Sequence, residues 1–302
     1  MADSDQKPAP RAGRLREAAG YLDWLLNPWQ RRSAEDVYDL LSTRALTETG
    51  LYLNLGYWRE ADDLDQASAA LARLVADTAG IGPGQRVVDA GYGFADQDLL
   101  WMAEYKPQRI IGLNVTTSQV ERARHRVAEA GFGDRVELLC ASATSMPLPA
   151  ESVDCVVALE SAFHFRTRTA FFDEAWRVLR PGGCLVTADI LPWTADESPA
   201  SGAGRRLSWW LVASRFAIPE ENRYGRARYA EHLRATGFGE VQVESIRDDV
   251  YAPLHQWFRR HPEALSRIHP LARWPARVAR WIPAERLYAG LDYVLARAVK
   301  PA

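Results

Sequence analysis

Asp89 and two glycines lie where a short apolar run ends, in the stretch VVDAGYGFADQ over residues 87–97. When a strand runs into a glycine turn and then a helix, backbone N–H groups can approach a ligand closely. The dinucleotide pattern G-x-G-x-x-G is not met, because the sixth position counted from Gly91 is Asp96. This departure argues against a nicotinamide oxidoreductase. The carboxylate of Asp89, just before the turn, suits a cationic amino group better than a pyrophosphate.

A histidine and an aspartate follow two later apolar runs. His164 comes after VDCVVAL (153–159), and Asp189 stands near the end of CLVTADI (184–190). The carboxyl ends of parallel strands meet at the edge of an open sheet where ligands bind. We therefore expect the two side chains to lie within hydrogen-bonding reach. Such a pair suits removal of a hydroxyl proton, with Asp189 fixing the imidazole tautomer. A histidine that only caps the strand end is the alternative.

The chain around these residues alternates short β-branched runs with helical stretches. Strands are expected at 86–90, 109–113, 135–140, 153–159, 184–190, 240–246 and 291–299, and helices at 13–27, 33–46, 63–80, 95–105, 118–131, 168–179 and 226–238. This alternation predicts an α/β fold, with a parallel sheet covered by helices on both faces. Residues 191–227 and 250–288 do not fit the alternation, and we interpret them as insertions.

The composition narrows the classes of protein. The chain has 302 residues, of which 47% are hydrophobic and 25% charged, with a net charge of −2. A basic field that would attract nucleic acid is therefore absent. The sequence has neither an apolar signal region at its N-terminus nor a run of about 18 apolar residues, so we expect a cytoplasmic protein without a membrane span. The three cysteines fit no zinc spacing, and we expect no metal.

Taken in order, these motifs resemble those of class I S-adenosylmethionine (SAM)-dependent methyltransferases. The pattern D-x-G-x-G-x-A that begins at Asp89 resembles the first motif of the family. MPLP at 146–149 and LRPGGCLVTADI at 179–190 resemble later segments, and the resemblance covers about residues 50–190. It implies a Rossmann-like sheet of seven strands with helices on both faces, and SAM as the cofactor. The layout is similar to that of natural-product enzymes such as the rebeccamycin-type sugar methyltransferases.

The resemblance also implies a set of cofactor contacts. Asn114 stands where the family usually has an acid that binds the ribose hydroxyls, and Ser142 replaces an aspartate near the adenine. LYLNLGYW (51–58) resembles an element that covers the sulfonium pocket, although simple aromatic packing is the alternative. Glu160 follows the fourth strand, below the methyl donor. The predicted cofactor-binding residues are Asn54, Gly56, Tyr57, Asp89, Gly91, Tyr92, Gly93, Asn114, Val115, Gln119, Ser142, Ala143, Glu160 and Ser161.

In the rebeccamycin-type sugar O-methyltransferases, a histidine and an aspartate at these positions are implicated in catalysis. The resemblance therefore implies catalytic roles for His164 and Asp189, although Phe163 replaces the first of the two adjacent histidines of that family. We expect methyl transfer to a hydroxyl of a lipophilic small molecule in secondary-metabolite tailoring. C-methylation of an isoprenoid or polyketide carbon is one alternative. A cyclase or binding protein of the same fold is another, because Asn114 and Ser142 replace common acidic contacts.

The expected organisation has three parts. Residues 1–12 form a flexible tail, 13–80 an N-terminal helical cap, and 81–302 the SAM-binding domain. That domain carries a lid insertion at about 191–227 and a helical insertion at about 250–288. The sequence is compatible with a homo-oligomer.

Tryptophans are frequent in both insertions. Trp193, Trp209 and Trp210 lie in the first, which favours a bulky, lipophilic acceptor. The second interleaves arginines with Trp257, Trp274 and Trp281. We expect these helices to pack over the substrate pocket, and contact with a membrane surface is the alternative.

Overall fold

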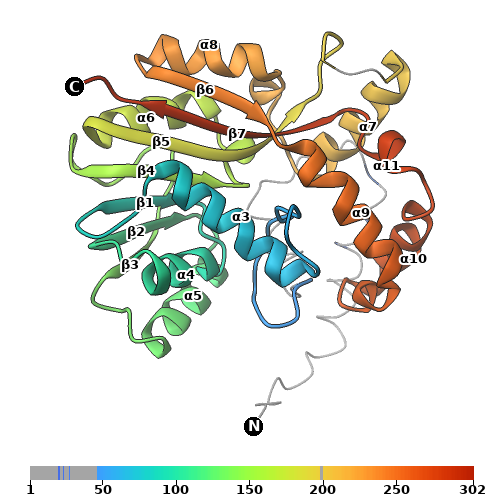
Figure 1. Ribbon diagram of the computed structural model, residues 1–302, viewed down its shortest axis with the longest axis horizontal. Coiled ribbons are helices and arrows are strands. Elements are labelled where there is room, and N and C mark those ends of the chain that lie inside the picture. Colours follow the sequence, from blue (N-terminus) through green and yellow to red (C-terminus); the bar gives the residue numbers. More distant parts are fainter. Residues whose placement is uncertain (1–19, 21–22, 24–26, 28–45, 198–199) are drawn as a thin grey trace.

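The structure is a computed structural model that describes residues 20, 23, 27, 46–197 and 200–302. Its centre is a seven-stranded sheet with the strand order β3-β2-β1-β4-β5-β7-β6 (Figure 1). The strands are β1 (Arg86–Ala90), β2 (Arg109–Asn114), β3 (Val136–Cys140), β4 (Val153–Leu159), β5 (Leu179–Pro192), β6 (Gly239–Ser245) and β7 (Leu291–Val299). Strands β1 to β5 pair in parallel, and β7 is antiparallel to both of its neighbours. The predicted α/β fold is confirmed, with one antiparallel strand that the alternation alone does not indicate.

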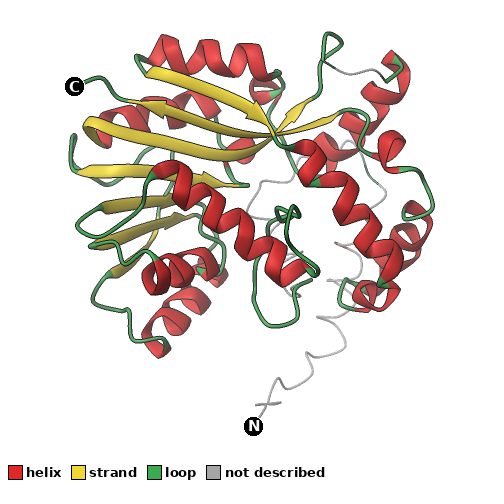
Figure 2. Cartoon of the chain, in the orientation of Figure 1, coloured by secondary structure: helices red, strands yellow, loops and turns green. Residues whose placement is uncertain are grey.

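Helices cover both faces of the sheet (Figure 2). They are α3 (Leu64–Ala79), α4 (Asp96–Glu104), α5 (Thr117–Glu129), α6 (Arg168–Val178), α7 (Gly202–Arg215), α8 (Arg226–Thr236), α9 (Tyr251–Arg260), α10 (Pro270–Ala279) and α11 (Ala284–Leu287). Helices α3, α4 and α5 contribute to one buried cluster, and α6 and α8 contribute to the cluster on the opposite face. This is the arrangement expected when strands and helices alternate along the chain.

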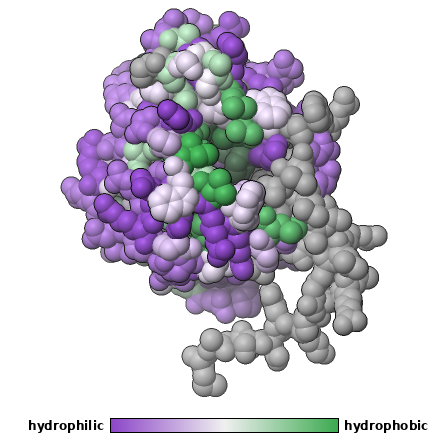
Figure 3. All heavy atoms as spheres, turned by 90° about the vertical axis from the view of Figure 1, so that its right-hand side faces the viewer, coloured by the Kyte–Doolittle hydropathy of each residue, from purple (hydrophilic) through white to green (hydrophobic). Residues whose placement is uncertain are grey.

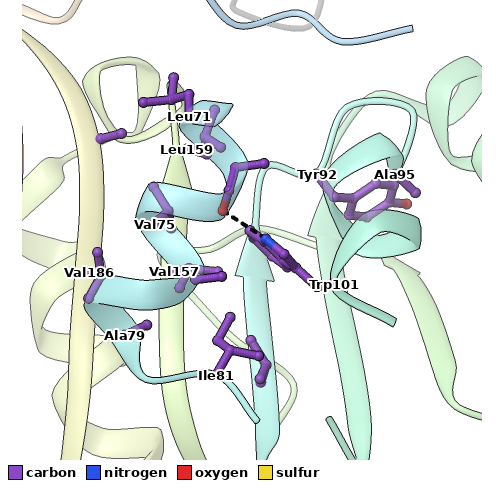
Figure 4. Close-up of a cluster of buried hydrophobic side chains, with 14 of the residues drawn as sticks. Leu71, Val75, Ala79, Ile81, Tyr92, Ala95, Trp101, Val157, Leu159 and Val186 are labelled. Atoms are coloured by element: carbon purple, nitrogen blue, oxygen red, sulfur yellow. Dashed lines mark hydrogen bonds between the residues drawn. The ribbon is translucent and has the colours of Figure 1, made fainter. Parts of the chain in front are cut away.

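The strands send successive side chains to opposite faces, as the period of two requires. In β4, Val157 joins the cluster under α3 whereas Val156 joins the one under α6. Figure 4 shows Leu71, Val75 and Ala79 of α3 packed towards Val157 and Val186. The indole of Trp101 donates a hydrogen bond of 2.9 Å to the carbonyl of Ala72 in the same cluster. The core therefore fixes α3 and α4 against one face of the sheet.

Local signals explain the ends of α3. Asp63 caps its first turn by accepting a hydrogen bond from the Gln66 amide at 2.8 Å. Gly80 follows its last residue in the left-handed conformation, with φ of 63°, which glycine adopts readily. The helix predicted at 63–80 is thus confirmed. The tail predicted at 1–12 and the helices predicted at 13–27 and 33–46 lie outside the described residues, apart from a few isolated positions.

Both predicted insertions lie together on one side of the sheet. The first contains α7 and the second contains α9, α10 and α11. Figure 3 looks onto this side and shows hydrophobic residues gathered near the middle of the face. Trp257 is buried against Trp58, with ring centroids 5.8 Å apart. Trp274 and Trp281, by contrast, are 73% and 69% exposed.

No helix in the described part of the chain is long and apolar enough to cross a membrane.

Candidate active site

A cavity of about 330 Å³ opens at the carboxyl ends of β1, β2 and β4. The β1–β4 boundary is where the order of the parallel strands reverses, which is the usual ligand site of open α/β sheets. The predicted residues that line it are Asn54, Gly91, Tyr92, Gly93, Asn114, Val115, Gln119, Ser142, Ala143, Glu160, Ser161 and His164. The structure thus brings most of the predicted site together.

The glycine turn that follows β1 has no room for side chains. Gly91 has φ of +94°, and a Cβ placed there would lie 2.3 Å from the Cβ of Ser161. Gly93 has φ of +57°, and its Cβ would lie 3.2 Å from Leu53. Any other residue at either position would be strained. The two glycines therefore let the backbone form one wall of the cavity.

Asn114 and Gln119 form a second wall. The Asn114 amide donates to Gln119 Oε1 at 2.8 Å, and its own oxygen accepts from the Thr116 N–H at 3.1 Å. Gln119 Nε2 is buried and has no hydrogen-bond partner among the residues that the structure describes. A buried donor without an acceptor is costly, so this group suits a ligand oxygen. A ribose hydroxyl would provide one.

Glu160 contributes a buried carboxyl to the cavity. The Leu55 N–H and the Tyr293 hydroxyl both donate to its Oε1, at 2.6 and 2.7 Å. Burial raises the pKa of Glu160 to about 7. Among the residues that the structure describes, no lysine or arginine acts on that pKa, although Arg166 also lines the cavity. The site consequently favours a cationic ligand group beside Glu160.

Asp89 lies behind the cavity rather than in its lining. Its Oδ2 accepts from Nε2 of Gln97 at 3.0 Å, and Gln97 itself lines the cavity. Asp98 is hydrogen-bonded to Asp89, and both side chains are fully buried. Burial raises the pKa of Asp89 to about 7 and that of Asp98 well above its usual range. The Asp89 carboxyl is therefore linked to the cavity lining through Gln97.

Two predicted residues of the segment 51–58 also lie elsewhere. Gly56 packs on α3, where a Cβ would lie 2.6 Å from the Cβ of Ala67, and its N–H donates to Asn54 Oδ1 at 3.0 Å. Tyr57 faces a separate groove beside α3 and α4. Of the three candidates in this segment, the structure brings only Asn54 to the cavity.

His164 ends a short 3-10 turn (Ala162–His164) directly after β4. It lines the cavity and is 8% exposed. Burial, together with a smaller effect of the Arg168 charge, lowers its pKa to about 3. The main chain of Phe216, which is hydrogen-bonded to the ring, acts to raise the pKa, as an accepting carbonyl does. At neutral pH the imidazole is therefore uncharged.

Asp189 does not orient His164, and this corrects the predicted pair. Its Oδ2 accepts from Arg168 Nε at 2.9 Å, and its Oδ1 accepts from the Ile190 N–H at 3.0 Å. Both side chains are fully buried. Burial raises the pKa of Asp189, whereas Arg168 acts to lower it. Arg168 opens α6, directly after the loop of His164, and it takes the position beside Asp189 that was expected for the imidazole.

Several lining residues were not predicted. They are Leu53, Gln97, Leu113, Thr116, Ala141, Thr144, Leu159, Phe165, Arg166 and Ala217. Gln97 ends the glycine motif, and Phe165 and Arg166 directly follow His164, so proximity in sequence could have indicated them. Ala217 comes from the first insertion, where no local pattern marks it. The expected lid tryptophans Trp193, Trp209 and Trp210 are not among the lining residues.

The residues present fit SAM. Its cationic groups match the carboxyl of Glu160, and its ribose matches the buried donor of Gln119. Gly91 and Gly93 leave space for close approach of the ligand to the backbone. The same cavity contains a neutral imidazole, so a cofactor and a proton acceptor could meet there.

Comparison with known proteins agrees with this geometry. A family model described as "Methyltransferase domain" matches residues 88–187. The chain is 37% identical over 298 residues to the erythromycin 3''-O-methyltransferase of Saccharopolyspora erythraea, which covers 95% of this chain and 97% of that protein. It is 36% identical over 200 residues to the 27-O-demethylrifamycin SV methyltransferase of Amycolatopsis mediterranei, covering 65% of this chain and 70% of that one.

The fold is also similar to that of the 4+2 cyclase SpnF, with a TM-score of 0.64 and 21% identity over 95% of this chain and 96% of that one. This likeness concerns the fold alone. The relationship in sequence extends over nearly the whole chain, insertions included. The chain therefore belongs to the class I SAM-dependent methyltransferases that act on natural products.

Proposed function

We propose that the enzyme transfers the methyl group of SAM to a hydroxyl of a lipophilic natural product, with a sugar hydroxyl of a glycosylated macrolide as the leading acceptor. The observation that carries hydroxyl methylation is the buried, neutral His164 in the same cavity as the glycine turn. A hydroxyl must lose its proton during transfer, and His164 can receive it. The acceptor class follows from the relative that methylates erythromycin at a 3''-oxygen.

Each residue has a distinct role in this proposal. SAM, when bound, supplies an electrophilic methyl group on a sulfonium. The backbone at Gly91 and Gly93 and the amide of Gln119 hold the nucleoside part, and Glu160 holds a cationic group. A ring nitrogen of His164 would take the proton of the acceptor hydroxyl, whose oxygen would receive the methyl group that SAM supplies. The protein contributes mainly alignment, worth up to roughly 7–11 kcal/mol in well-oriented systems.

The test uses purified enzyme, SAM with a tritiated methyl group, and a macrolide with a free 3''-hydroxyl. The same macrolide with a 3''-O-methyl group is the matched control. We expect label in the first product only, on oxygen by NMR. Label on carbon would instead indicate C-methylation. Calorimetric SAM binding without transfer to any hydroxylated macrolide would refute the acceptor class, and absence of SAM binding by folded protein would refute the cofactor site.

A further inference from the structure

One asparagine in the first insertion touches the main chain on both sides of His164. Asn222 is fully buried, and its Nδ2 donates to the carbonyl of Phe163 at 3.1 Å and to that of Phe165 at 2.8 Å. It ends a 3-10 turn (Glu220–Asn222) that lies more than fifty residues further along the chain. Because His164 stands between the two acceptors, this single amide fixes the backbone of its turn.

Asn222 is itself held by Arg168. The Arg168 N–H donates to Asn222 Oδ1, and Nη1 donates to the Asn222 carbonyl, both at 2.8 Å. Arg168 is fully buried and binds Asp189 on β5. Its guanidinium also lies 5.0 Å from the ring centroid of Tyr224 and 5.2 Å from that of Tyr229. The sheet, α6 and α8 therefore fix the position of Asn222.

The same part of the insertion touches the imidazole and the cavity. The main chain of Phe216 is hydrogen-bonded to the His164 ring. Ala217 lines the cavity, and Ile218 is buried in the core. We call residues 216–224 the lid segment. His164 is thus held at its backbone by Asn222 and at its ring by Phe216, both from the lid segment.

We propose that Asn222 is a positioning residue, which joins the lid segment to the turn of His164 so that the lid sets the orientation of the base. Asp189 then acts on His164 only through Arg168 and Asn222. The role of His164 as the base rests on the proposed function. The effect of Asn222 on the tautomer and pKa of the imidazole does not. The proposal predicts that an acceptor that shifts the lid segment also shifts His164.

The link has a measurable consequence for the charge of the imidazole. Burial lowers the pKa of His164 to about 3, from an ordinary value of 6.5. The charged groups nearby are Arg168 on α6, and Arg166 and Glu160, which line the same cavity. Arg168 is the one that acts on this pKa in the described structure. Release of the turn would expose the ring to water, and its pKa would rise towards 6.5.

The experiment is an NMR titration of the full chain with ¹⁵N-labelled histidine, in the presence of S-adenosylhomocysteine. His164→Asn identifies the resonances of His164. In the wild type we expect a single neutral tautomer down to about pH 5. In Asn222→Ala we expect mixed tautomers and an apparent pKa raised by two units or more. If the alanine variant does not fold, Asn222→Ser, which keeps one hydroxyl at the position, is titrated in its place.

Ser208→Ala is the matched control. Ser208 is a buried residue of α7, and its hydroxyl donates to the carbonyl of Leu287 at 2.7 Å, on the other side of the insertion. Ser208→Ala also removes a buried hydrogen bond from a side chain to a main-chain carbonyl, but outside the lid segment, so the titration of His164 should not change. An unchanged His164 titration in folded Asn222 variants would overturn the proposal, as would an equal change in Ser208→Ala.

Turnover provides a separate readout. In single-turnover methylation of the macrolide with a free 3''-hydroxyl, Asn222→Ala should lower the rate 10- to 100-fold. The affinity for SAM should stay within threefold, because Asn222 is not among the lining residues. If the wild type does not methylate this macrolide, only the proposed function is contradicted. The positioning role of Asn222 is still tested by the titration, which needs no acceptor.

Discussion

The glycine turn after β1 and the turn of His164 after β4 follow neighbouring strands of one sheet, yet different parts of the chain hold them. The first is fixed by adjacent strands and by its own residues, as the Gly91 N–H donates to Leu113 at 2.7 Å and the Ala95 N–H to Tyr92 at 2.9 Å. The second has local bonds of its own, such as that from the His164 N–H to Ser161 at 3.0 Å, and it is held in addition by Asn222 and Phe216, which belong to the first insertion. The glycine turn is thus held within the sheet and its flanking residues, whereas the turn of His164 also depends on the first insertion.

This difference separates two kinds of substitution. A change in the glycine turn should affect SAM binding and leave the proton step alone. A change in the turn of His164 or its supports should affect the rate and leave SAM binding alone. The variants below test that separation.

The largest effect is expected for His164→Ala. Loss of a positioned proton acceptor typically costs about 10²–10⁴-fold in rate, and we expect this loss in single-turnover methylation. SAM affinity by calorimetry should remain within threefold of the wild type. His125→Ala is the control, because that side chain is 75% exposed on α5. A His164→Ala rate within a few-fold of the wild type would contradict the assignment of the base.

Asp189→Asn should act mainly on stability. It leaves the fully buried Arg168 without its carboxylate, and removal of one partner from a buried pair costs about 3–5 kcal/mol. Glu104→Gln removes an exposed partner of Arg73 and should cost about 0–1 kcal/mol. Urea unfolding measures both. If Asp189→Asn is instead stable and binds SAM but has lost methyl transfer, the result would support direct orientation of His164 by Asp189.

The same contrast explains what the sequence could predict. Gly91 and Gly93 are predictable because they form a glycine pattern directly after a strand, and Asn114 because it ends the next strand. Asp189 was placed at the correct strand end, but its partner was wrong. No local pattern shows that Arg168 turns inwards to meet it, or that Asn222 crosses to the His164 turn. Such contacts depend on long-range packing of the insertion, which has no periodic signal.

Gly91→Ala tests the wall of the cavity that the glycine turn after β1 forms. Its Cβ would overlap Ser161, and φ of +94° adds backbone strain of about 1–3 kcal/mol. We expect SAM affinity to fall by roughly tenfold or more, since each 1.4 kcal/mol is a factor of ten. Gly131→Ala has a comparable φ of +75° with open space around its Cβ, so it reproduces the strain without the overlap. Equal SAM affinity in the two variants would show that the overlap with Ser161 is irrelevant to the cofactor.

The smallest effect concerns pH and Glu160. Burial raises the pKa of Glu160 to about 7 from 4.5, so the folded protein retains a proton that the unfolded chain loses. The stability that this proton provides is therefore present below pH 4.5 and is lost as the pH rises through 7. An ionised Glu160 should attract a cation, so SAM affinity should increase roughly tenfold between pH 5.5 and 7.5, as the ionised fraction grows.

Glu160→Gln should remove the part of the pH dependence of SAM affinity that comes from Glu160. Any part that comes from the Asp89–Asp98 pair should remain, because the pKa of Asp89 is also raised to about 7. Asp98→Asn separates the two, because it retains Glu160 and takes one carboxyl from the pair. Calorimetry across the pH range gives the slopes for all three proteins. If Glu160→Gln keeps the wild-type slope and Asp98→Asn loses it, the cation lies against the Gln97–Asp89 side of the cavity. The carboxyl of Asp89, which lies behind the cavity lining, would then take part in binding the cofactor.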